Sequence, residues 1–189
     1  MNRNRQLLDR FFTAGQIRLQ CSALFDTHPL PLSPPPSWER VAGMLLGVAI
    51  GDALGNTSES QHPAARRARY GEIRDYLPNR YANGQAVGLP SDDTQLTFWT
   101  LEQFLADGGV NPEHLAARFC REQIFGIGSA VREFIGNYKA GHPWYECGPP
   151  SAGNGALMRI APVVIPYLRQ PSPDLWGDAT LLAMITHND

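Results

Sequence analysis

The residues best suited to chemistry stand together in the stretch Ser-Asp-Asp-Thr at positions 91–94, which carries two carboxylates and two hydroxyls. Pro90 precedes this stretch, and an apolar run with helical spacing, positions 96–105, follows it. Hard divalent cations such as Mg²⁺ bind carboxylate, hydroxyl and carbonyl oxygens, so oxygen atoms gathered on one turn can hold such an ion. The stretch therefore indicates a metal site at the start of a helix.

A structural role explains the same residues. Ser91 is a good helix N-cap, and Asp92 and Asp93 in the first turn would offset the positive end of the helix dipole. Taken by themselves, these residues favour capping. The two roles do not exclude each other, because a helix N-terminus on a rigid scaffold is a good mount for ligands.

An earlier helix is expected to begin at Trp38, with Ser37 as its N-cap. Its apolar residues step by three and four and predict a buried face: Trp38, Val41, Leu45 and Val48. A glycine in a helix costs about 1 kcal/mol relative to alanine. A glycine at every fourth position therefore indicates close packing of another helix backbone, at Gly43, Gly47, Gly51 and Gly55.

Asp52 falls on the apolar face of this helix, one turn after Val48. An aspartate in such a place must accept hydrogen bonds or lie near a cation. Capping of a neighbouring helix or turn is an equally good explanation, and both stay open. Gly55 is expected to end the helix. Glu59 then lies in the following loop and is, by composition, a surface acid.

Further helical signals appear along the rest of the chain. Asn111 and Pro112 start a helix that is expected to run to about Phe125, and a second is expected at 129–138. Asp178 is expected to cap a last helix at 179–186, whereas residues 61–88 are polar and predict a long loop over the site. No stretch alternates like a strand, so the sequence predicts an all-α domain of orthogonally packed helices.

Residues 1–37 are expected to form an extension, and 38–189 the folded domain. Apolar residues at 7, 8, 11 and 12 have the spacing of a short amphipathic helix. Residues 28–36 contain five prolines in nine positions, which favours a semi-rigid polyproline II linker. A proline-rich ligand for another domain is the alternative for this segment.

Composition excludes several classes of function. The chain of 189 residues has a formal net charge of −2 and no basic excess, so no nucleic-acid partner is expected. Its three cysteines are far apart, which argues against a disulfide framework or a zinc site and favours a cytoplasmic location. The longest apolar run, 41–54, is too short to span a bilayer, so no membrane partner is expected.

Four segments resemble the ADP-ribosylglycohydrolase family, in the family's order and over about residues 38–189. They are GMLLGVAIGDALGNTSE at 43–59, SDDTQLT at 91–97, GNGALMRIAP at 153–162 and THND at 186–189. The resemblance implies an all-α fold and an enzyme that hydrolyses the glycosidic bond between ADP-ribose and a modified protein side chain or a related ADP-ribosyl compound. It also implies two Mg²⁺ ions, with Mn²⁺ as an alternative.

The resemblance gives roles to individual residues. It implies metal ligands at Ser91, Asp92 and Asp93, and catalytic roles for Glu59 and Asp93. It implies contacts with the ADP-ribosyl substrate at Gly153, Asn154, Gly155 and His187. Arg159 is expected to be structural and to pair with an acid beneath the site.

The family pattern includes a further Asp-x-Asp-Thr/Ser motif, which completes the metal site and which this sequence does not contain. Three explanations stay open. The sequence is a fragment truncated at its C-terminus, or a second polypeptide supplies the missing ligands. Alternatively, the chain is a non-catalytic relative that binds ADP-ribose or serves structurally, as a lens crystallin does.

Overall fold

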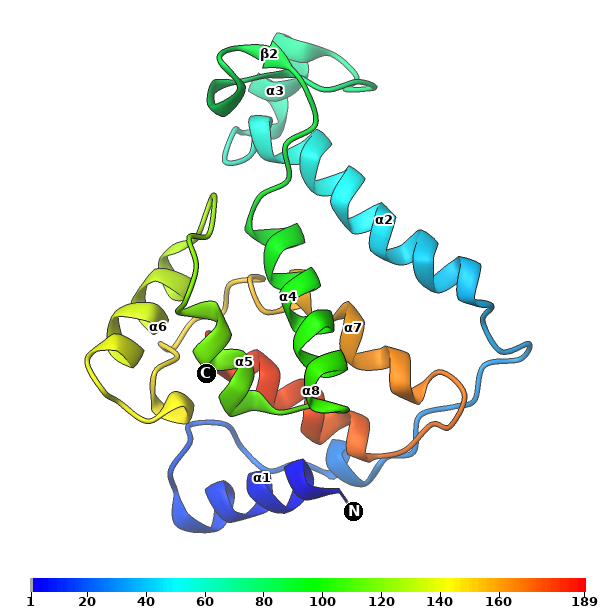
Figure 1. Cartoon of the computed structure of the whole chain (residues 1–189), viewed down its shortest axis with the longest axis vertical. Helices are drawn as coiled ribbons and strands as arrows, with labels where there is room; N and C mark the ends of the chain where they lie inside the picture. Colours follow the sequence, from blue (N-terminus) through cyan, green and yellow to red (C-terminus); the bar gives the residue numbers. More distant parts are fainter. Residues whose placement is uncertain (1) are drawn as a thin grey trace.

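Helices make up 57% of the protein in the computed structural model, which describes residues 2–189. The all-α prediction is therefore confirmed. Figure 1 shows the helices in chain order: α1 (Arg3–Ala14), α2 (Trp38–Gly55), α3 (Pro63–Tyr70), α4 (Asp92–Asp107), α5 (Pro112–Phe119), α6 (Ser129–Lys139), α7 (Ala161–Val164) and α8 (Asp174–Met184). Among these described residues the only strands are β1 (Pro78–Asn79) and β2 (Gln85–Ala86), which pair antiparallel with Pro78 opposite Ala86.

The hydrophobic core lies where α4, α5, α7 and α8 meet. Fully buried side chains from these helices include Leu96, Phe119, Val163 and Leu181. Short connections keep the helices in contact: α4 ends at Gly108, whose φ of 66° gives the left-handed cap that glycine adopts without strain. As predicted, Asn111 caps α5, its side chain accepting from the backbone of His114 at 3.3 Å.

The N-terminal segment packs onto this core. The predicted amphipathic helix is α1, which lies against α8, and its Leu8 and Phe11 are 0% and 5% exposed. Arg5 reaches on to the segment after α1 and binds the carbonyl of Phe25. Residues 27–37 are irregular, and Leu30 among them is 87% exposed.

Helix α2 begins where the sequence predicts, but the prediction of a buried face is wrong. Of the four predicted residues, Trp38 is 60% exposed and Val41, Leu45 and Val48 are only half-buried. The buried residues of α2 are Asp52 and Ala53, in its final turns. A side chain at any of its four glycines would meet nothing within 4 Å, so no helix of the described residues 2–189 packs there. Figure 1 shows α2 running along the edge of the molecule. When a helix carries apolar residues around its whole circumference, their spacing does not identify one buried face.

Three further segments differ from the predictions. Residues 61–88 contain α3 and the β1–β2 pair, seen at the top of Figure 1, rather than a continuous loop. Helix α5 ends at Phe119 instead of Phe125, and α8 begins at Asp174 instead of 179. Asp178 is therefore not a cap. It lies inside α8, only 4% exposed, and accepts hydrogen bonds from α1, including one from Asn4 Nδ2 at 2.8 Å.

Within residues 2–189, no helix combines the length and the apolar character that crossing a bilayer requires.

Replacing Leu8 by alanine tests the packing of α1. A fully buried leucine leaves a cavity when truncated, so we expect Leu8→Ala to lower the free energy of unfolding by about 2–4 kcal/mol in a urea titration. Leu30→Ala, at an exposed leucine of the same segment, should change it by less than about 0.5 kcal/mol. Equal effects of the two substitutions would mean that α1 is not part of the folded core.

Candidate functional site

The carboxylate of Asp52 joins the end of α2 to the start of α4. One oxygen, Oδ2, accepts from the backbone of Ser91 at 2.6 Å and from the backbone and hydroxyl of Thr94 at 3.2 and 2.6 Å. The other oxygen, Oδ1, accepts from Ser91 Oγ at 2.7 Å and from Asn56 Nδ2 at 3.1 Å. Of the two explanations that the sequence leaves open for Asp52, capping of a neighbouring helix is confirmed.

This arrangement changes the role of Ser91. The residue occupies the N-cap position of α4, as predicted, but its side chain makes no capping hydrogen bond to its own helix. Its hydroxyl hydrogen is instead donated to Asp52. Because a hydroxyl has one hydrogen and two lone pairs, the lone pairs of Ser91 Oγ stay available to another group.

Three carboxylates gather beside Asp52 at this end of α4. Asp92 is 9% exposed, and burial together with the charge of Asp93 raises its pKa to about 6. Burial also raises the pKa of Asp93, with further contributions from the charges of Asp52 and Glu59. No basic side chain contributes to either shift. The start of α4 is therefore a region of uncompensated negative charge.

The donor set suits a hard cation but does not surround one. Oxygen atoms from Ser91, Asp92 and Asp93 are the type of ligand that Mg²⁺ and Mn²⁺ bind, and their like charges favour a cation between them. Within residues 2–189, however, no group of three or more His, Cys, Asp or Glu side chains is placed to hold a metal ion. These residues fit part of a coordination shell, and the remaining ligands would come from water, substrate or other protein groups.

Glu59 lies exposed at the end of the 3₁₀ turn η2 (Asn56–Ser58), directly after α2. Its charge contributes to the raised pKa of Asp92 and of Asp93, which places it near both. Asn56 holds the turn in place, since its Nδ2 also donates to the carbonyl of Leu89 at 2.6 Å. Asn56 was not predicted as a site residue, although its position four residues after Asp52 puts it on the same helix face.

A loop around residues 123–126, which was not predicted as part of the site, covers the start of α4. Gly126 has a φ of 79°, and a Cβ there would lie 3.2 Å from Asp92 Oδ1. Gln95 anchors the loop: its side chain accepts from the backbone of Phe125 at 2.8 Å and donates to the carbonyl of Gln123 at 3.3 Å. Glycine is thus required at position 126 both for the backbone conformation and for the close approach.

The predicted substrate-binding turn meets His187. A Cβ at Gly155 would lie 3.1 Å from His187 Nε2, and a Cβ at Gly153 would lie 3.5 Å from the same atom. The structure therefore brings the turn and His187 together; Asn154, between the two glycines, is exposed. The turn leads into the 3₁₀ turn η5 (Leu157–Arg159). It lies beside α4, because Thr97 Oγ1 binds the carbonyl of Met158 at 3.2 Å.

Within residues 2–189 Arg159 does not pair with an acid, so that prediction is wrong. Its guanidinium is 1% exposed and donates to the carbonyl of Leu182 and the hydroxyl of Thr186, both at 2.8 Å. It also lies 5.2 Å from the centre of the Phe119 ring. Burial lowers its pKa to about 9. The carbonyls at the C-terminal end of α8, the negative end of the helix dipole, take the place of the expected acid.

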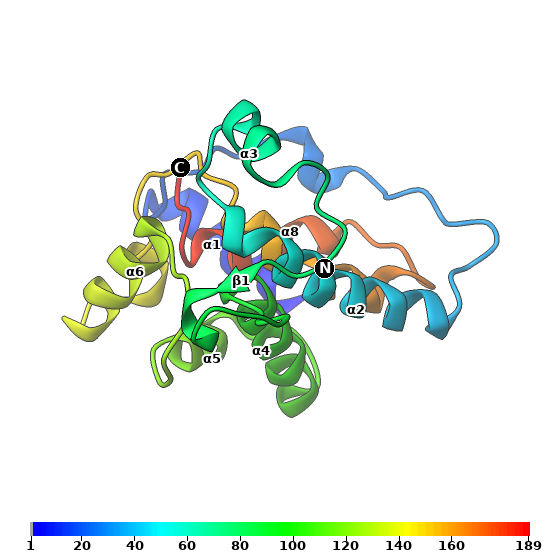
Figure 2. The same ribbon diagram turned by 90° about the horizontal axis from the view of Figure 1, so that it is seen from above.

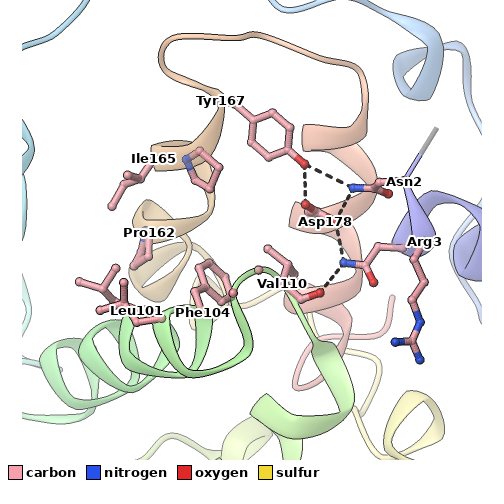
Figure 3. Close-up of a pocket in the computed structure, with 14 residues that line it drawn as sticks. Asn2, Arg3, Leu101, Phe104, Val110, Pro162, Ile165, Tyr167 and Asp178 are labelled. Atoms are coloured by element: carbon pink, nitrogen blue, oxygen red, sulfur yellow. Dashed lines mark hydrogen bonds between the residues drawn. The ribbon is translucent and has the colours of Figure 1, made fainter.

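The cavity in Figure 3 lies elsewhere. It has a volume of about 550 Å³ and is formed by α1, the second half of α4, the segment after α7, and α8. Leu101 and Phe104 form its apolar side, and Asn2, Tyr167 and Asp178 form a hydrogen-bonded group at its polar end. None of the predicted site residues lines it.

Comparisons with known proteins identify a family and several relatives of the chain. The sequence model of the family described as ADP-ribosylglycohydrolase matches residues 33–189. The chain is 35% identical to an uncharacterized protein of Archaeoglobus fulgidus over 133 residues, which cover 68% of the chain and 43% of that protein.

Two relatives carry names that state a reaction. The ADP-ribosylarginine hydrolase Tri1 of Pseudomonas putida is 28% identical over 83% of the chain and 44% of its own length. The ADP-ribosyl-[dinitrogen reductase] glycohydrolase of Rhodospirillum rubrum is 29% identical over 82% of the chain and 53% of its own length. The chain thus spans about half the length of the curated relatives it matches.

Replacing Asp52 by asparagine tests the link between α2 and α4. Burial raises the pKa of Asp52, but the hydrogen bonds from Thr94 and Ser91 outweigh this and lower it below its ordinary value of 3.8. The ionised form therefore stabilises the fold above that pH, and its contribution is lost as the pH falls through the lowered pKa. We expect Asp52→Asn to lower the free energy of unfolding at neutral pH by about 2–4 kcal/mol, measured by urea titration.

The control for this variant is Asp75→Asn, which changes an exposed aspartate whose side chain accepts one local hydrogen bond. A loss in Asp52→Asn that is no larger than the loss in the control would show that Asp52 does not hold the two helices together.

The raised pKa of Asp92 gives a second prediction, in which the substitution raises the stability of the fold instead of lowering it. The folded protein binds the Asp92 proton more tightly than the unfolded chain does, so stability falls as the pH rises from 3.8 towards about 6. After allowance for solvent screening, we expect Asp92→Asn to stabilise the metal-free protein at pH 7 by about 1–2 kcal/mol and to have little effect below the unfolded pKa. Chemical denaturation at several pH values measures this. Destabilisation at pH 7 would instead make Asp92 a structural first-turn residue.

Proposed function

The chain belongs to the ADP-ribosylglycohydrolase family, and we propose that it forms part of a Mg²⁺-dependent site that hydrolyses ADP-ribosyl bonds. The bond would join ADP-ribose to a modified protein side chain or lie in a related ADP-ribosyl compound. One observation carries the proposal. At the start of α4, two adjacent buried or half-buried carboxylates and a serine with free lone pairs face no basic partner.

The charges at the start of α4 support the proposal. Ionising these carboxyls is unfavourable, because burial and the charge of Asp93 raise the pKa of Asp92, and burial and the charges of Asp52 and Glu59 raise the pKa of Asp93. A divalent cation would relieve this repulsion, with Ser91, Asp92 and Asp93 as its protein ligands. Mn²⁺ would satisfy the same oxygen ligands. Bound there, the ion would orient the ribose hydroxyls and lower the pKa of a bound water.

Glu59 is the proposed general acid–base residue. Its carboxylate is exposed and lies near the two aspartates, so it can reach a water or a leaving group above them. Cleavage at the anomeric carbon develops positive charge on the ribose, which the surrounding carboxylates stabilise. Asp93 would contribute both as a ligand and through this charge.

The substrate would lie between α4 and the glycine-rich turn. Gly153 and Gly155 carry no side chain, and any Cβ at Gly155 would collide with the ring of His187. Bare backbone at Gly153–Gly155, with His187 behind it, suits close approach of a diphosphate or ribose. The names of two relatives specify arginine and dinitrogen reductase as the modified groups, and we propose an ADP-ribosylated protein or a small ADP-ribosyl compound as the substrate class.

A second candidate function is ADP-ribose binding without hydrolysis. It is favoured by the absence, within residues 2–189, of three acidic, histidine or cysteine side chains placed to hold one ion. In that case the glycine-rich turn and His187 would bind the nucleotide, and the carboxylates would contribute little.

We also propose a cytoplasmic location. Its support is the set of three unpaired cysteines, of which Cys21 is exposed, since thiols stay reduced in that compartment.

Release of ADP-ribose from a peptide that carries ADP-ribosylarginine tests the proposal. The assay uses the complete polypeptide, whether that is the 189-residue chain or a longer protein that contains it. We expect release that requires Mg²⁺, stops with a chelator, and is abolished in the Asp92→Asn/Asp93→Asn double variant. Mg²⁺ should also raise the melting temperature of the parent but not of this variant.

Glu59→Gln should lower the rate by about 10²–10⁴-fold while Mg²⁺ still raises the melting temperature. Glu133→Gln, at an exposed glutamate on α6, is the matched control and should leave the rate unchanged. Binding of ADP-ribose without any release would support the second candidate. Release that persists in the double variant would contradict the metal site.

A further inference from the structure

A line of polar contacts runs from the buried guanidinium of Arg159 to the glycine-rich turn. Arg159 Nη2 lies 2.8 Å from Thr186 Oγ1, which lies 2.8 Å from His187 Nδ1. The other ring nitrogen, Nε2, is the atom that a Cβ at Gly153 or Gly155 would approach to 3.5 or 3.1 Å. The line therefore connects a buried cation to the surface on which the proposed substrate lies.

The direction of each hydrogen bond follows from the groups involved. A guanidinium can only donate, so Thr186 Oγ1 accepts from Arg159. Thr186 is 0% exposed, and the hydrogen bonds of the described residues give its own hydrogen one acceptor, His187 Nδ1. If Nδ1 instead carried a proton and donated it, the hydroxyl hydrogen would be buried without a partner, which is costly.

The hydrogen bond from Thr186 fixes the tautomer of His187. A neutral imidazole has one nitrogen that accepts and one that donates. Since Nδ1 accepts from Thr186, the proton must be on Nε2. This N–H lies on the edge of the ring that contacts the glycine-rich turn.

We propose that Arg159, acting through Thr186, holds His187 in the neutral Nε2–H tautomer, so that the ring donates a hydrogen bond to an anionic oxygen bound at Gly153–Gly155. Arg159 and Thr186 are then positioning residues for a ligand contact made by His187. The identity of the oxygen, a diphosphate oxygen of ADP-ribose, rests on the proposed function; the tautomer does not.

Two further features support this arrangement. Burial, followed by the charge of Arg159, lowers the pKa of His187, which keeps the ring neutral. The guanidinium, in turn, is held by the carbonyl of Leu182 and by Thr186 and has no acidic partner among the described residues. Its charge is therefore free to polarise the Thr186 hydroxyl towards His187.

The direct test is a pH titration of the His187 ring nitrogens by ¹⁵N NMR in the 189-residue chain. A His187→Gln variant identifies the signals among those of the five histidines. We expect a protonated Nε2 and an unprotonated Nδ1 at neutral pH. Thr186→Val, which keeps the shape but removes the hydroxyl, should raise the pKa of His187, because a donor to the neutral ring is lost. Thr186→Ser, the matched control, retains the hydroxyl and should leave this pKa near the parental value.

The opposite sign would overturn the inference. If His187 Nδ1–H donates to Thr186, removal of that acceptor in Thr186→Val lowers the pKa of His187 instead of raising it. Arg159→Lys and Arg159→Met extend the test. The methionine variant loses the positive charge, so it should raise the pKa of His187 further than the lysine variant, which keeps that charge. If these variants fail to fold, the comparison of Thr186→Val with Thr186→Ser still shows which of the two residues donates the hydrogen bond.

A second measurement separates this inference from the proposed function. ADP-ribose, added to the ¹⁵N-labelled chain, should shift the Nε2–H resonance of His187, and Thr186→Val should weaken its binding by about 5–10-fold relative to Thr186→Ser. An unmoved Nε2–H resonance would overturn the contact between His187 and ADP-ribose, whereas the proposed hydrolysis is decided by the release assay. A reversed pKa shift in Thr186→Val would overturn the hydrogen-bond relay alone.

Discussion

The hydrogen bonds of Asp52 set the position of α4 relative to α2, and the candidate site depends on them. The first amides of an α-helix have no partner within the helix and are usually bound by a side chain at its own N-cap. Here a carboxylate from another helix binds two of these amides and two hydroxyls. Because Asp52 does the capping, Ser91, Asp92 and Asp93 are left free for another role. Capping, one of the two roles that the sequence leaves open for these residues, is thus carried out in the structure by a residue of the other helix.

Local signals predicted much of the fold. Asn111 followed by Pro112 marks the start of α5, and Ser91 occupies the N-cap of α4, because caps depend on neighbours a few residues away. Asp178 shows where such signals fail. Aspartate is a common capping residue, but Asp178 accepts hydrogen bonds from Asn2 and Asn4, at the start of α1, which are more than 170 residues away in sequence. These hydrogen bonds allow Asp178 to lie inside α8.

The candidate site was likewise predicted only in part. Sequence patterns and resemblance were enough to name Ser91, Asp92, Asp93 and the Gly153–Gly155 turn, and their roles stay predictions. Gly126 was not predicted, because its contact with Asp92 depends on how the loop after α5 folds back. The surroundings of Arg159 were predicted wrongly, since helix carbonyls replace the acid that a buried cation would be expected to need. A helix end that serves as a counter-charge leaves no trace in residue types.

The exposed apolar surface of α2 has a thermodynamic consequence. The heat-capacity change on unfolding, and the steepness with which denaturant lowers stability, both scale with the apolar surface that becomes newly exposed. Side chains such as Leu46 and Ile50, which are 61% and 50% exposed in the folded chain, contribute little to that change. The protein should therefore have a flatter stability curve against temperature than a chain of the same length that buries all of its apolar helices.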